Sequence, residues 1–424
     1  MAEKQRVVLV GINITAKAKK SSDIDIFDSM KELEELAQAA GAEVIATAVQ
    51  NKDTYDPAYL IGKGKVEEIG EIAKNSDCDL IIFNDVLSGV QLKNLEQITD
   101  VSVIDRTALI LDIFAQRALS KEGKLQVELA MQKYRLSHLT GLGGALSRLG
   151  AGIGTRGPGE KKLETDKRHI NRRIIEIKKD LEEIAKNRSV QRLRRSKSDL
   201  PIVALVGYTN SGKSTILNEM IRLNKDHDKE KEVLTKDMLF ATLDVSHRKC
   251  TLPSNLDILV TDTVGFVSKL PHELVESFKA TLEEVKYADL LLHVVDLSNE
   301  KYKLQMQTTE KVLSEIGISD KKTLYVFNKA DKVGYESSIS VDEPFVMISA
   351  AKKYNLDKFY EEIERILLSG RQNVTLKIPY KDSHILSLIK SKYPVQEQFE
   401  ENFVIINTKM DKSDIEKYSK YIGG

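Results

Sequence analysis

The chain has 424 residues, of which 41% are apolar, and its 64 Lys and Arg balance 64 Asp and Glu. This length exceeds one ordinary domain, and the neutral balance argues against a generic nucleic-acid coat while leaving room for local basic surfaces. Two cysteines, Cys78 and Cys250, fit a reduced compartment and give no zinc pattern. Because no apolar run approaches the ~20 residues of a membrane span, and the charged start is unlike a signal peptide, we expect a cytoplasmic protein without a membrane span.

Residues 1–111 are predicted to form a parallel α/β domain. Short apolar runs alternate there with helical patterns, giving strands at 6–12, 42–49, 79–83 and 101–104 and helices at 27–40, 65–74 and 88–98. This alternation predicts a small parallel sheet with helices on its faces. The basic, glycine-rich loop 61–65 lacks the spacing of a nucleotide-binding loop. A turn with solvated lysines is therefore the simpler interpretation, and a second nucleotide site is the alternative.

Residues 112–198 are predicted to form an antiparallel helical hairpin. Side chains recur there at spacings of three and four, first at Leu125, Leu129, Gln132, Leu136 and Leu139, then at Ile170, Ile174, Ile177, Leu181 and Ile184. The connector 141–159 contains eight glycines in nineteen residues. A loop of this length without structure of its own is usually functional or disordered.

The second helix of this hairpin is strongly basic. Between Lys161 and Lys197 there are fourteen Lys or Arg against six Asp or Glu. Such a surface can neutralise several phosphates, and a flexible cationic tip suits the shape-based recognition of folded RNA. The candidate RNA-binding residues are Arg148, Arg156, Lys161, Lys162, Arg168, Arg172 and Arg173. The alternative is a solvated helix face beside a flexible linker.

Residues 199–370 carry a phosphate-binding loop. The pattern glycine, four residues, Gly-Lys-Ser follows the apolar run 202–206 and opens onto a helical pattern. Glycines let the backbone N–H groups converge on phosphate oxygens, while the lysine reaches the β- and γ-phosphates and the serine hydroxyl faces Mg²⁺. The expected nucleotide-binding residues are Gly207, Tyr208, Thr209, Asn210, Ser211, Gly212, Lys213, Ser214 and Thr215.

Three further motifs follow apolar runs in this region and indicate guanine nucleotides in a doubly wound, P-loop GTPase fold. Asp262 of Asp-Thr-Val-Gly is expected to hold Mg²⁺, and the Gly265 N–H to contact the γ-phosphate. In Asn328-Lys329-Ala-Asp331 the final carboxylate accepts hydrogen bonds from guanine N1–H and N2–H₂. Ser349 and Ala350 are expected to offer a backbone N–H to guanine O6. Residues 371–424 are predicted to form a small α+β domain with strands at 374–378 and 403–407 and helices at 383–389 and 412–421.

Six stretches of the chain are distinctive: Leu60-Ile-Gly-Lys-Gly-Lys-Val66, the run from Asp105 to Arg117, Glu122 to Leu129, Arg156-Gly-Pro-Gly-Glu to Asp166, Phe240-Ala-Thr-Leu-Asp244 and Asp262 to Phe266. With these stretches, almost the whole chain resembles the HflX family of ribosome-associated GTPases. The resemblance implies binding to the large ribosomal subunit and its RNA, with the hairpin near the peptidyl-transferase region. It also implies separation of stalled or idle ribosomes into subunits.

The resemblance also assigns roles within the nucleotide site. Thr242 is expected to be the switch residue that meets Mg²⁺ and the γ-phosphate, with Thr235 as the weaker alternative. Lys213, Thr242 and Gly265 then form the catalytic set, and Ser214, Thr242 and Asp262 the Mg²⁺ ligands. Asn210 resembles the asparagine with which related GTPases bind K⁺, although it also suits a simple turn. Phe266 stands where many GTPases have a water-orienting glutamine, so we expect slow intrinsic hydrolysis.

The leading hypothesis is a GTPase, expected to be monomeric, in which GTP and GDP switch the conformation that docks on the ribosome. One alternative is an RNA-binding assembly or sensing factor in which nucleotide occupancy matters and turnover does not. Another adds an ATP-driven RNA-remodelling activity in the N-terminal domain.

Overall fold

The computed structural model describes most of the chain. The described residues are 4–15, 25–146, 158–195, 200–223, 240, 246–263, 265–269, 271, 274, 276–278, 283–318, 320–333, 339, 341–393 and 395–422. The chain divides into two compact units, the first made of Met1–Arg188, Asp237–Asp244 and Val267–Thr281 and the second of Ser189–Lys236, Val245–Phe266 and Leu282–Gly424. The first unit thus includes two short segments from the middle of the sequence. The division into four domains at 111, 198 and 370 stays a prediction.

The N-terminal region contains a four-stranded parallel sheet in the order β2-β1-β3-β4, as predicted. Its elements are β1 (Arg6–Ile14), α1 (Ile26–Ala39), β2 (Glu43–Lys52), α2 (Lys63–Asn75), β3 (Leu80–Phe83), α3 (Gly89–Thr99), β4 (Ser102–Asp105) and α4 (Arg106–Arg117). Successive side chains of a strand point to opposite faces. Val8, Val10 and Ile12 of β1 accordingly pack in one cluster with Val66 and Ile69 of α2.

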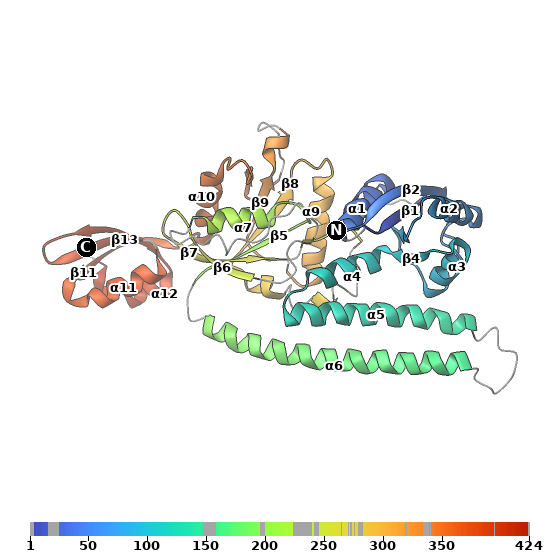
Figure 1. Cartoon of the computed structure of the whole chain (residues 1–424). Coiled ribbons are helices and arrows are strands. Elements are labelled where there is room, and N and C mark those ends of the chain that lie inside the picture. Colours follow the sequence, from blue (N-terminus) through green and yellow to red (C-terminus); the bar gives the residue numbers. More distant parts are fainter. Residues whose placement is uncertain are drawn as a thin grey trace. The chain divides into compact units, whose positions relative to one another are not determined.

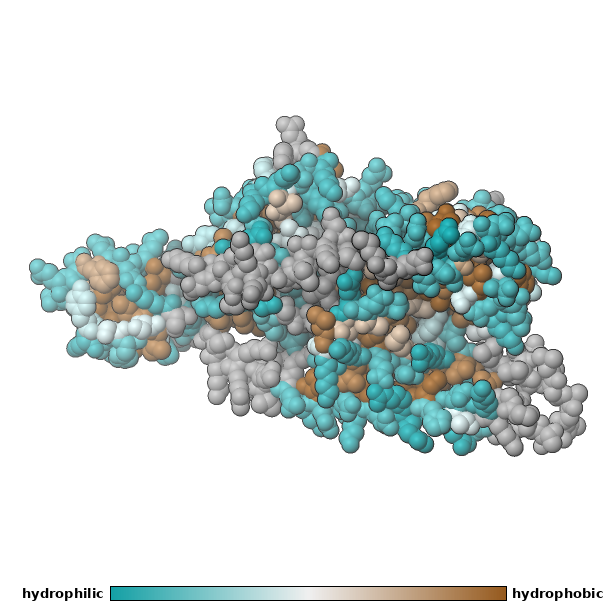
Figure 2. Space-filling view, in the orientation of Figure 1, coloured by the Kyte–Doolittle hydropathy of each residue, from teal (hydrophilic) through white to brown (hydrophobic). Residues whose placement is uncertain are grey.

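The predicted hairpin is formed by α5 (Lys121–Leu146) and α6 (Pro158–Arg195), which lie side by side and antiparallel (Figure 1). Eight of the ten predicted seam residues pack in one cluster: Leu125, Leu129, Leu136, Ile170, Ile174, Ile177, Leu181 and Ile184. Figure 2 shows this seam as a line of hydrophobic side chains bordered by hydrophilic ones. The seam prediction is confirmed.

The connector is shorter than the predicted loop 141–159, so that prediction was wrong at both ends. Helix α5 continues through Leu146, and α6 begins at Pro158. Glycine costs a helix only about 1 kcal/mol per residue, and each added residue of an existing long helix gains a hydrogen bond. Proline suits the first helical position because its missing N–H has no partner there in any case. Residues 147–157, with Arg148 and Arg156, lie outside the described residues.

The second unit contains a six-stranded sheet in the order β10-β9-β8-β5-β7-β6. All neighbours are parallel except β6, which pairs antiparallel with β7. Its elements are β5 (Ile202–Gly207), α7 (Lys213–Ile221), β6 (Ser246–Thr251), β7 (Asp257–Asp262), η2 (Glu283–Tyr287), β8 (Leu290–Asp296), α9 (Tyr302–Glu315), β9 (Thr323–Asn328), η3 (Ala330–Lys332), β10 (Phe345–Met347) and α10 (Leu356–Leu367). Helices α7 and α10 pack on one face of the sheet and α9 on the other. The doubly wound arrangement was predicted, whereas the antiparallel edge strand β6 was not.

Residues from Gln372 onward form a separate three-stranded antiparallel sheet in the order β11-β13-β12. Its elements are β11 (Gln372–Pro379), η4 (Tyr380–Asp382), α11 (Ser383–Lys392), β12 (Val395–Phe399), β13 (Phe403–Met410), α12 (Lys412–Lys417) and η5 (Ser419–Tyr421). The α+β prediction is confirmed, although β12 was not predicted. Within the described residues no helix is both long and apolar enough to cross a membrane.

Candidate nucleotide-binding site

The loop between β5 and α7 has the backbone of a phosphate-binding loop. Gly207 and Gly212 have φ values of +143° and +97°. A Cβ at Gly207 would lie 2.2 Å from the Val294 carbonyl oxygen, and one at Gly212 would lie 2.1 Å from the Asn328 side-chain nitrogen. Only glycine fits at both positions, and α7 begins directly afterwards, so its free N–H groups and dipole face this loop.

Lys213 is buried inside the loop. Its ammonium donates hydrogen bonds to the carbonyl oxygens of Gly207 at 3.0 Å and Tyr208 at 2.7 Å. Burial lowers the pKa of Lys213 to about 8, and the Asp262 carboxylate partly offsets this effect. The hydroxyls of Thr209 and Ser211 are also buried and have no hydrogen-bond partner among the described residues. A buried cation with unsatisfied hydroxyls beside it suits an anionic, polar ligand such as a phosphate.

Ser214 and Asp262 place oxygen ligands beside Lys213. The Ser214 hydroxyl donates to Asp262 Oδ2 at 3.2 Å, and Asp262 is fully buried at the end of β7. A hydroxyl and a carboxylate suit Mg²⁺, which takes few protein ligands and completes its shell with phosphate and water. No cluster of three or more His, Cys, Asp or Glu with metal-binding geometry occurs in the described residues. Thr242 and Thr235, the two candidate switch residues, lie outside the described residues.

The backbone at Gly265 and Phe266 lies against the phosphate loop. A Cβ at Gly265 would lie 2.9 Å from Thr209 Cα and 3.0 Å from Lys213 Nζ, so glycine is required for this close approach. The Phe266 carbonyl accepts from the Thr209 N–H at 2.7 Å, and the Phe266 N–H donates to the Gly207 carbonyl at 3.2 Å. The Phe266 side chain is only 2% exposed. It therefore packs in the core and offers the site neither donor nor acceptor.

Asn328 is the centre of the predicted guanine-binding motif. Its side chain donates to the Ser211 carbonyl at 2.9 Å and accepts from the Ala350 N–H at 3.0 Å, so it joins the phosphate loop to the segment that follows β10. Asp331 accepts from the Ser349 hydroxyl at 2.6 Å. The predicted Ala350 donor to guanine O6 is thus engaged by Asn328 in this structure. Lys329 forms an ion pair with Asp296 at 2.8 Å, a partner that the sequence did not reveal.

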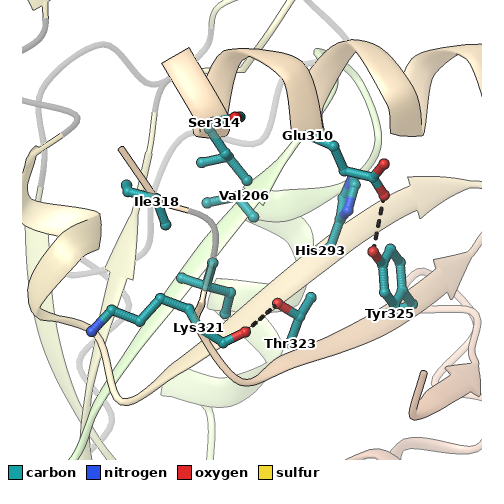
Figure 3. A pocket seen from close by; sticks show the side chains of 10 residues that line it. Val206, His293, Glu310, Ser314, Ile318, Lys321, Thr323 and Tyr325 are labelled. Atoms are coloured by element: carbon teal, nitrogen blue, oxygen red, sulfur yellow. Dashed lines mark hydrogen bonds between the residues drawn. The ribbon is translucent and has the colours of Figure 1, made fainter. Parts of the chain in front are cut away.

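A cavity of about 230 Å³ lies between α9 and the face of the sheet that carries Val206, the residue before the loop (Figure 3). His293 of β8 and Tyr325 of β9 line it, and Tyr325 donates to Glu310 at 2.9 Å. Burial and, secondarily, the charge of Lys213 lower the pKa of His293 to about 3. His293 therefore stays neutral at physiological pH and adds no positive charge beside Lys213.

Two segments adjacent in sequence to the nucleotide motifs belong to the first unit. Ser268, two residues after Phe266, is held by Glu32 of α1 and Arg106 of α4. Glu32 accepts from both the Ser268 hydroxyl and its N–H, and Arg106 donates to the Ser268 carbonyl at 3.2 Å. Arg106 is 2% exposed and pairs with Glu32 at 2.5 Å. No sequence pattern predicted this ion pair.

Aromatic and ionic contacts hold the same two segments. Phe240 and Phe278 each pack edge-on against Phe114 of α4, with ring centroids 4.5 and 5.3 Å away. Glu276 pairs with Lys133 of α5 at 2.6 Å. The segments that leave the nucleotide motifs are therefore built into the N-terminal core.

The loop 61–65 shows contacts that favour its interpretation as a turn. The Gly62 N–H donates to the Gln50 side chain at 2.7 Å, and Lys65 pairs with Glu68 at 2.6 Å. The Gly62 N–H and the Lys65 ammonium thus already have partners within this region.

Comparison with known proteins decides the family. Residues 27–115 match the family described as GTP-binding GTPase N-terminal, 117–195 the GTP-binding GTPase middle region, and 202–329 the 50S ribosome-binding GTPase family. The GTPase HflX of Caldanaerobacter subterraneus is 46% identical over 99% of this chain and 94% of its own length. The chain belongs to the HflX family of GTPases. HflX proteins of Lacrimispora saccharolytica and Escherichia coli are 44% and 37% identical over 95% and 94% of this chain and 93% and 91% of their own lengths.

In this HflX-family GTPase the predicted RNA-binding residues of α6 differ in their surroundings. Arg173 donates to both oxygens of Glu128 on α5, at 2.6 and 2.9 Å, so it links the two helices. Arg168 pairs with Glu164 along the helix at 2.8 Å. Arg172 and Lys162 are exposed, whereas the side chain of Lys161 lies outside the description. Arg172 and Lys162 are therefore the better placed residues for a phosphate contact.

The lowered pKa of Lys213 predicts pH-dependent nucleotide binding. Nucleotide phosphates favour the charged ammonium, so binding raises this pKa and takes up a proton near and above pH 8. We expect GDP affinity to fall about fourfold between pH 7 and 8.5, with proton uptake at pH 8.5 measured by calorimetry in buffers of different ionisation enthalpy. In Lys213→Arg, whose side chain remains charged, proton uptake should vanish. Equal affinity at both pH values would contradict the prediction.

Proposed function

We propose that this GTPase binds the large ribosomal subunit and separates stalled or idle ribosomes into subunits, with GTP as the conformational switch. The observation that carries this proposal is the seating of 237–244 and 267–281 in the first unit, which also contains most of the basic hairpin. Ordering of the switch segments by nucleotide then acts on the N-terminal core. In this proposal the protein acts as a monomer in the cytoplasm. Its four domains are divided at residues 111, 198 and 370.

Each site residue has a defined part in this mechanism. Lys213 neutralises phosphate charge, the loop N–H groups orient the phosphates, and Asn328 and Asp331 select guanine. Ser214, Asp262 and Thr242 hold Mg²⁺, which when bound neutralises charge on the β- and γ-phosphates. The Gly265 N–H contacts the γ-phosphate, and hydrolysis removes that contact. The hairpin, through Arg148, Arg156, Lys161, Lys162, Arg168 and Arg172, meets ribosomal RNA.

Sedimentation of 70S ribosomes tests this function. Wild-type protein with a non-hydrolysable GTP analogue should convert 70S particles into subunits on a sucrose gradient. A variant in which 147–157 is replaced by a short Gly-Ser linker leaves both described helices intact and should lose splitting. If this variant still splits ribosomes, residues 147–157 are not required for splitting. If the wild-type protein does not co-sediment with ribosomes, the ribosomal proposal is wrong.

A second function is favoured by the buried Phe266. Without a water-orienting side chain at this position, intrinsic turnover is slow, as an assembly or sensing factor controlled by occupancy requires. GTP turnover with and without large subunits distinguishes the two. Strong stimulation supports the splitting switch, and tight binding with unchanged turnover supports the sensor.

Asn210 is proposed to bind K⁺ beside the phosphates. Its φ is +58°, a left-handed conformation that asparagine and glycine tolerate best, so a turn alone also explains the residue. Asn210→Gly keeps this backbone and removes only the amide. If the amide holds K⁺, K⁺ but not Na⁺ will stimulate wild-type hydrolysis several-fold, and the variant will lose this difference. Equal wild-type rates in both salts would remove the K⁺ site.

A further inference from the structure

The C-terminal sheet has one face covered by helices and one face open. Strand β13 alternates strictly between buried and more exposed residues, and β11 does so from Asn373 onward. The buried side chains Val374, Leu376, Ile378, Val404, Ile406 and Met410 pack against Ile389, Tyr393, Tyr418 and Tyr421 from the segments that cover the inner face. The opposite side chains form what we call the outer face, which consists of Asn373, Thr375, Lys377, Pro379, Gln396, Gln398, Phe403, Ile405, Asn407 and Lys409.

The outer face contains no carboxylate. Strand register places Asn373 beside Lys409, then Thr375 beside Asn407 and Gln396, then Lys377 beside Ile405 and Gln398, and finally Pro379 beside Phe403. Four amides and two lysines therefore share one surface, and both lysines are exposed.

Four carboxylates of this domain lie outside the outer face and are engaged by the domain's own polar groups. Glu397 pairs with Lys390 at 2.5 Å, Asp411 with Arg371 at 3.1 Å and Asp414 with Lys392 at 2.9 Å. Asp382 accepts from Tyr421 at 2.8 Å. The outer face itself therefore carries two lysines and no carboxylate.

This chemistry fits RNA better than a protein partner. Lysines neutralise phosphates, and amides can both donate to and accept from base edges. The Thr375 hydroxyl donates to Asn407 Oδ1 at 2.6 Å and so fixes one of these amides. Phe403 offers part of a ring, with Lys377 Nζ 6.0 Å from its centroid. Protein interfaces usually centre on a larger apolar cluster than Phe403, Ile405 and Pro379 provide.

We propose that the outer face docks on an exposed, unpaired segment of ribosomal RNA in the large subunit and gives the protein a second anchor besides the hairpin. This inference rests on the proposed function, because it requires a ribosomal partner. Open sheets that present amides, cations and an aromatic ring recognise unpaired RNA by the same combination of contacts.

The first experiment reverses the charges. Lys377→Glu with Lys409→Glu is compared with Lys381→Glu and Lys412→Glu, two exposed lysines of the same domain outside the outer face. Pelleting with purified 50S subunits and a non-hydrolysable GTP analogue is measured over a range of salt concentrations. The outer-face pair should weaken binding at least about 10-fold and reduce the slope of log affinity against log salt by about 1.4–1.8, while the control pair leaves the slope near that of wild type.

The second experiment identifies the partner directly. An iron–EDTA reagent is attached to a cysteine at Thr375 or, as control, at Lys412, in a protein whose half-exposed Cys78 is replaced by Ser. Cleavage of 50S RNA from position 375 and not from 412 supports the proposal. Strong binding without such cleavage, or an unaltered outer-face charge variant, overturns it even though the ribosomal function stands. A wild-type protein that does not pellet with 50S removes the proposed function and this anchor together.

A variant that fails to fold is recognised independently. Gln396→Ala with Gln398→Ala removes two amides without reversing charge and should weaken 50S binding with little change in salt slope. Thermal unfolding of each variant is compared with wild type, and GDP affinity must remain unchanged, because the outer face contains no residue of the nucleotide site.

Discussion

The substitution Asp331→Asn should weaken binding of guanine nucleotides about 100-fold and create a preference for xanthosine nucleotides. The Asp331 carboxylate accepts from guanine N1–H and N2–H₂ in the proposed site, and each charge-assisted hydrogen bond contributes about 1.5–3 kcal/mol. An asparagine amide presents one donor and one acceptor, which match the C2 carbonyl and N1–H of xanthine. The Ser349 hydroxyl at 2.6 Å holds the side chain in place for either base.

Competition binding with a fluorescent nucleotide measures this effect. GDP and XDP are titrated against wild type, Asp331→Asn and the control Asp357→Asn, an exposed carboxylate in the first turn of α10. Only Asp331→Asn should bind XDP more tightly than GDP. If Asp331→Asn binds GDP as tightly as wild type, guanine is selected by other groups and the assignment of this motif fails.

Removal of one member of the Glu32–Arg106 pair should be among the most destabilising single changes in the protein. Arg106 is 2% exposed, and its guanidinium bonds Glu32, Asn84 and the Ser268 carbonyl. An unpaired buried charge costs about 3–5 kcal/mol, whereas replacement of both partners by apolar residues is often tolerated. Glu32→Leu and Arg106→Met should therefore each destabilise strongly, and the double variant should recover part of the loss.

Urea unfolding of wild type, the two single variants and the double variant gives the coupling free energy between Glu32 and Arg106. The pair of the exposed Arg365 with Glu362 serves as a control, and Arg365→Met should leave the urea midpoint nearly unchanged. Amide hydrogen exchange at 267–269 should rise in each single variant, because Ser268 loses a partner. Unchanged exchange there would contradict a role for the pair in holding this segment.

The nucleotide site was predictable because its chemistry is local in sequence. Gly207 and Gly212 are required by backbone conformation and close approach, and Asp262, Asn328 and Ser349 all lie at or just after the ends of buried strands. The hairpin seam was equally clear, since an apolar spacing of three and four leaves little choice of helix face. The predicted parallel sheet of the N-terminal region followed from apolar runs long enough to be buried on both faces.

The features that escaped prediction are those that depend on distant partners. Strands β6 (SHRKCT) and β12 (VQEQF) are mostly polar, and each lies at the edge of its sheet, so neither has an apolar pattern. The pairing of Glu32 with Arg106 joins two helices, and the contact of Glu32 with Ser268 spans 236 residues, more than half of the chain. No spacing rule connects such positions.

The composition of the first unit also sets an order of events during synthesis. Its first 188 residues leave the ribosome before Phe240, Ser268 and Phe278 have been synthesised. At that stage Phe114 lacks both of its aromatic contacts, and the Glu32–Arg106 pair lacks its hydrogen bonds to Ser268. At about 5–20 residues per second, the missing roughly 90 residues arrive about 5–20 s later. The N-terminal unit can therefore reach its final packing only after much of the nucleotide-binding sheet has been translated, which links the folding of the two halves in time.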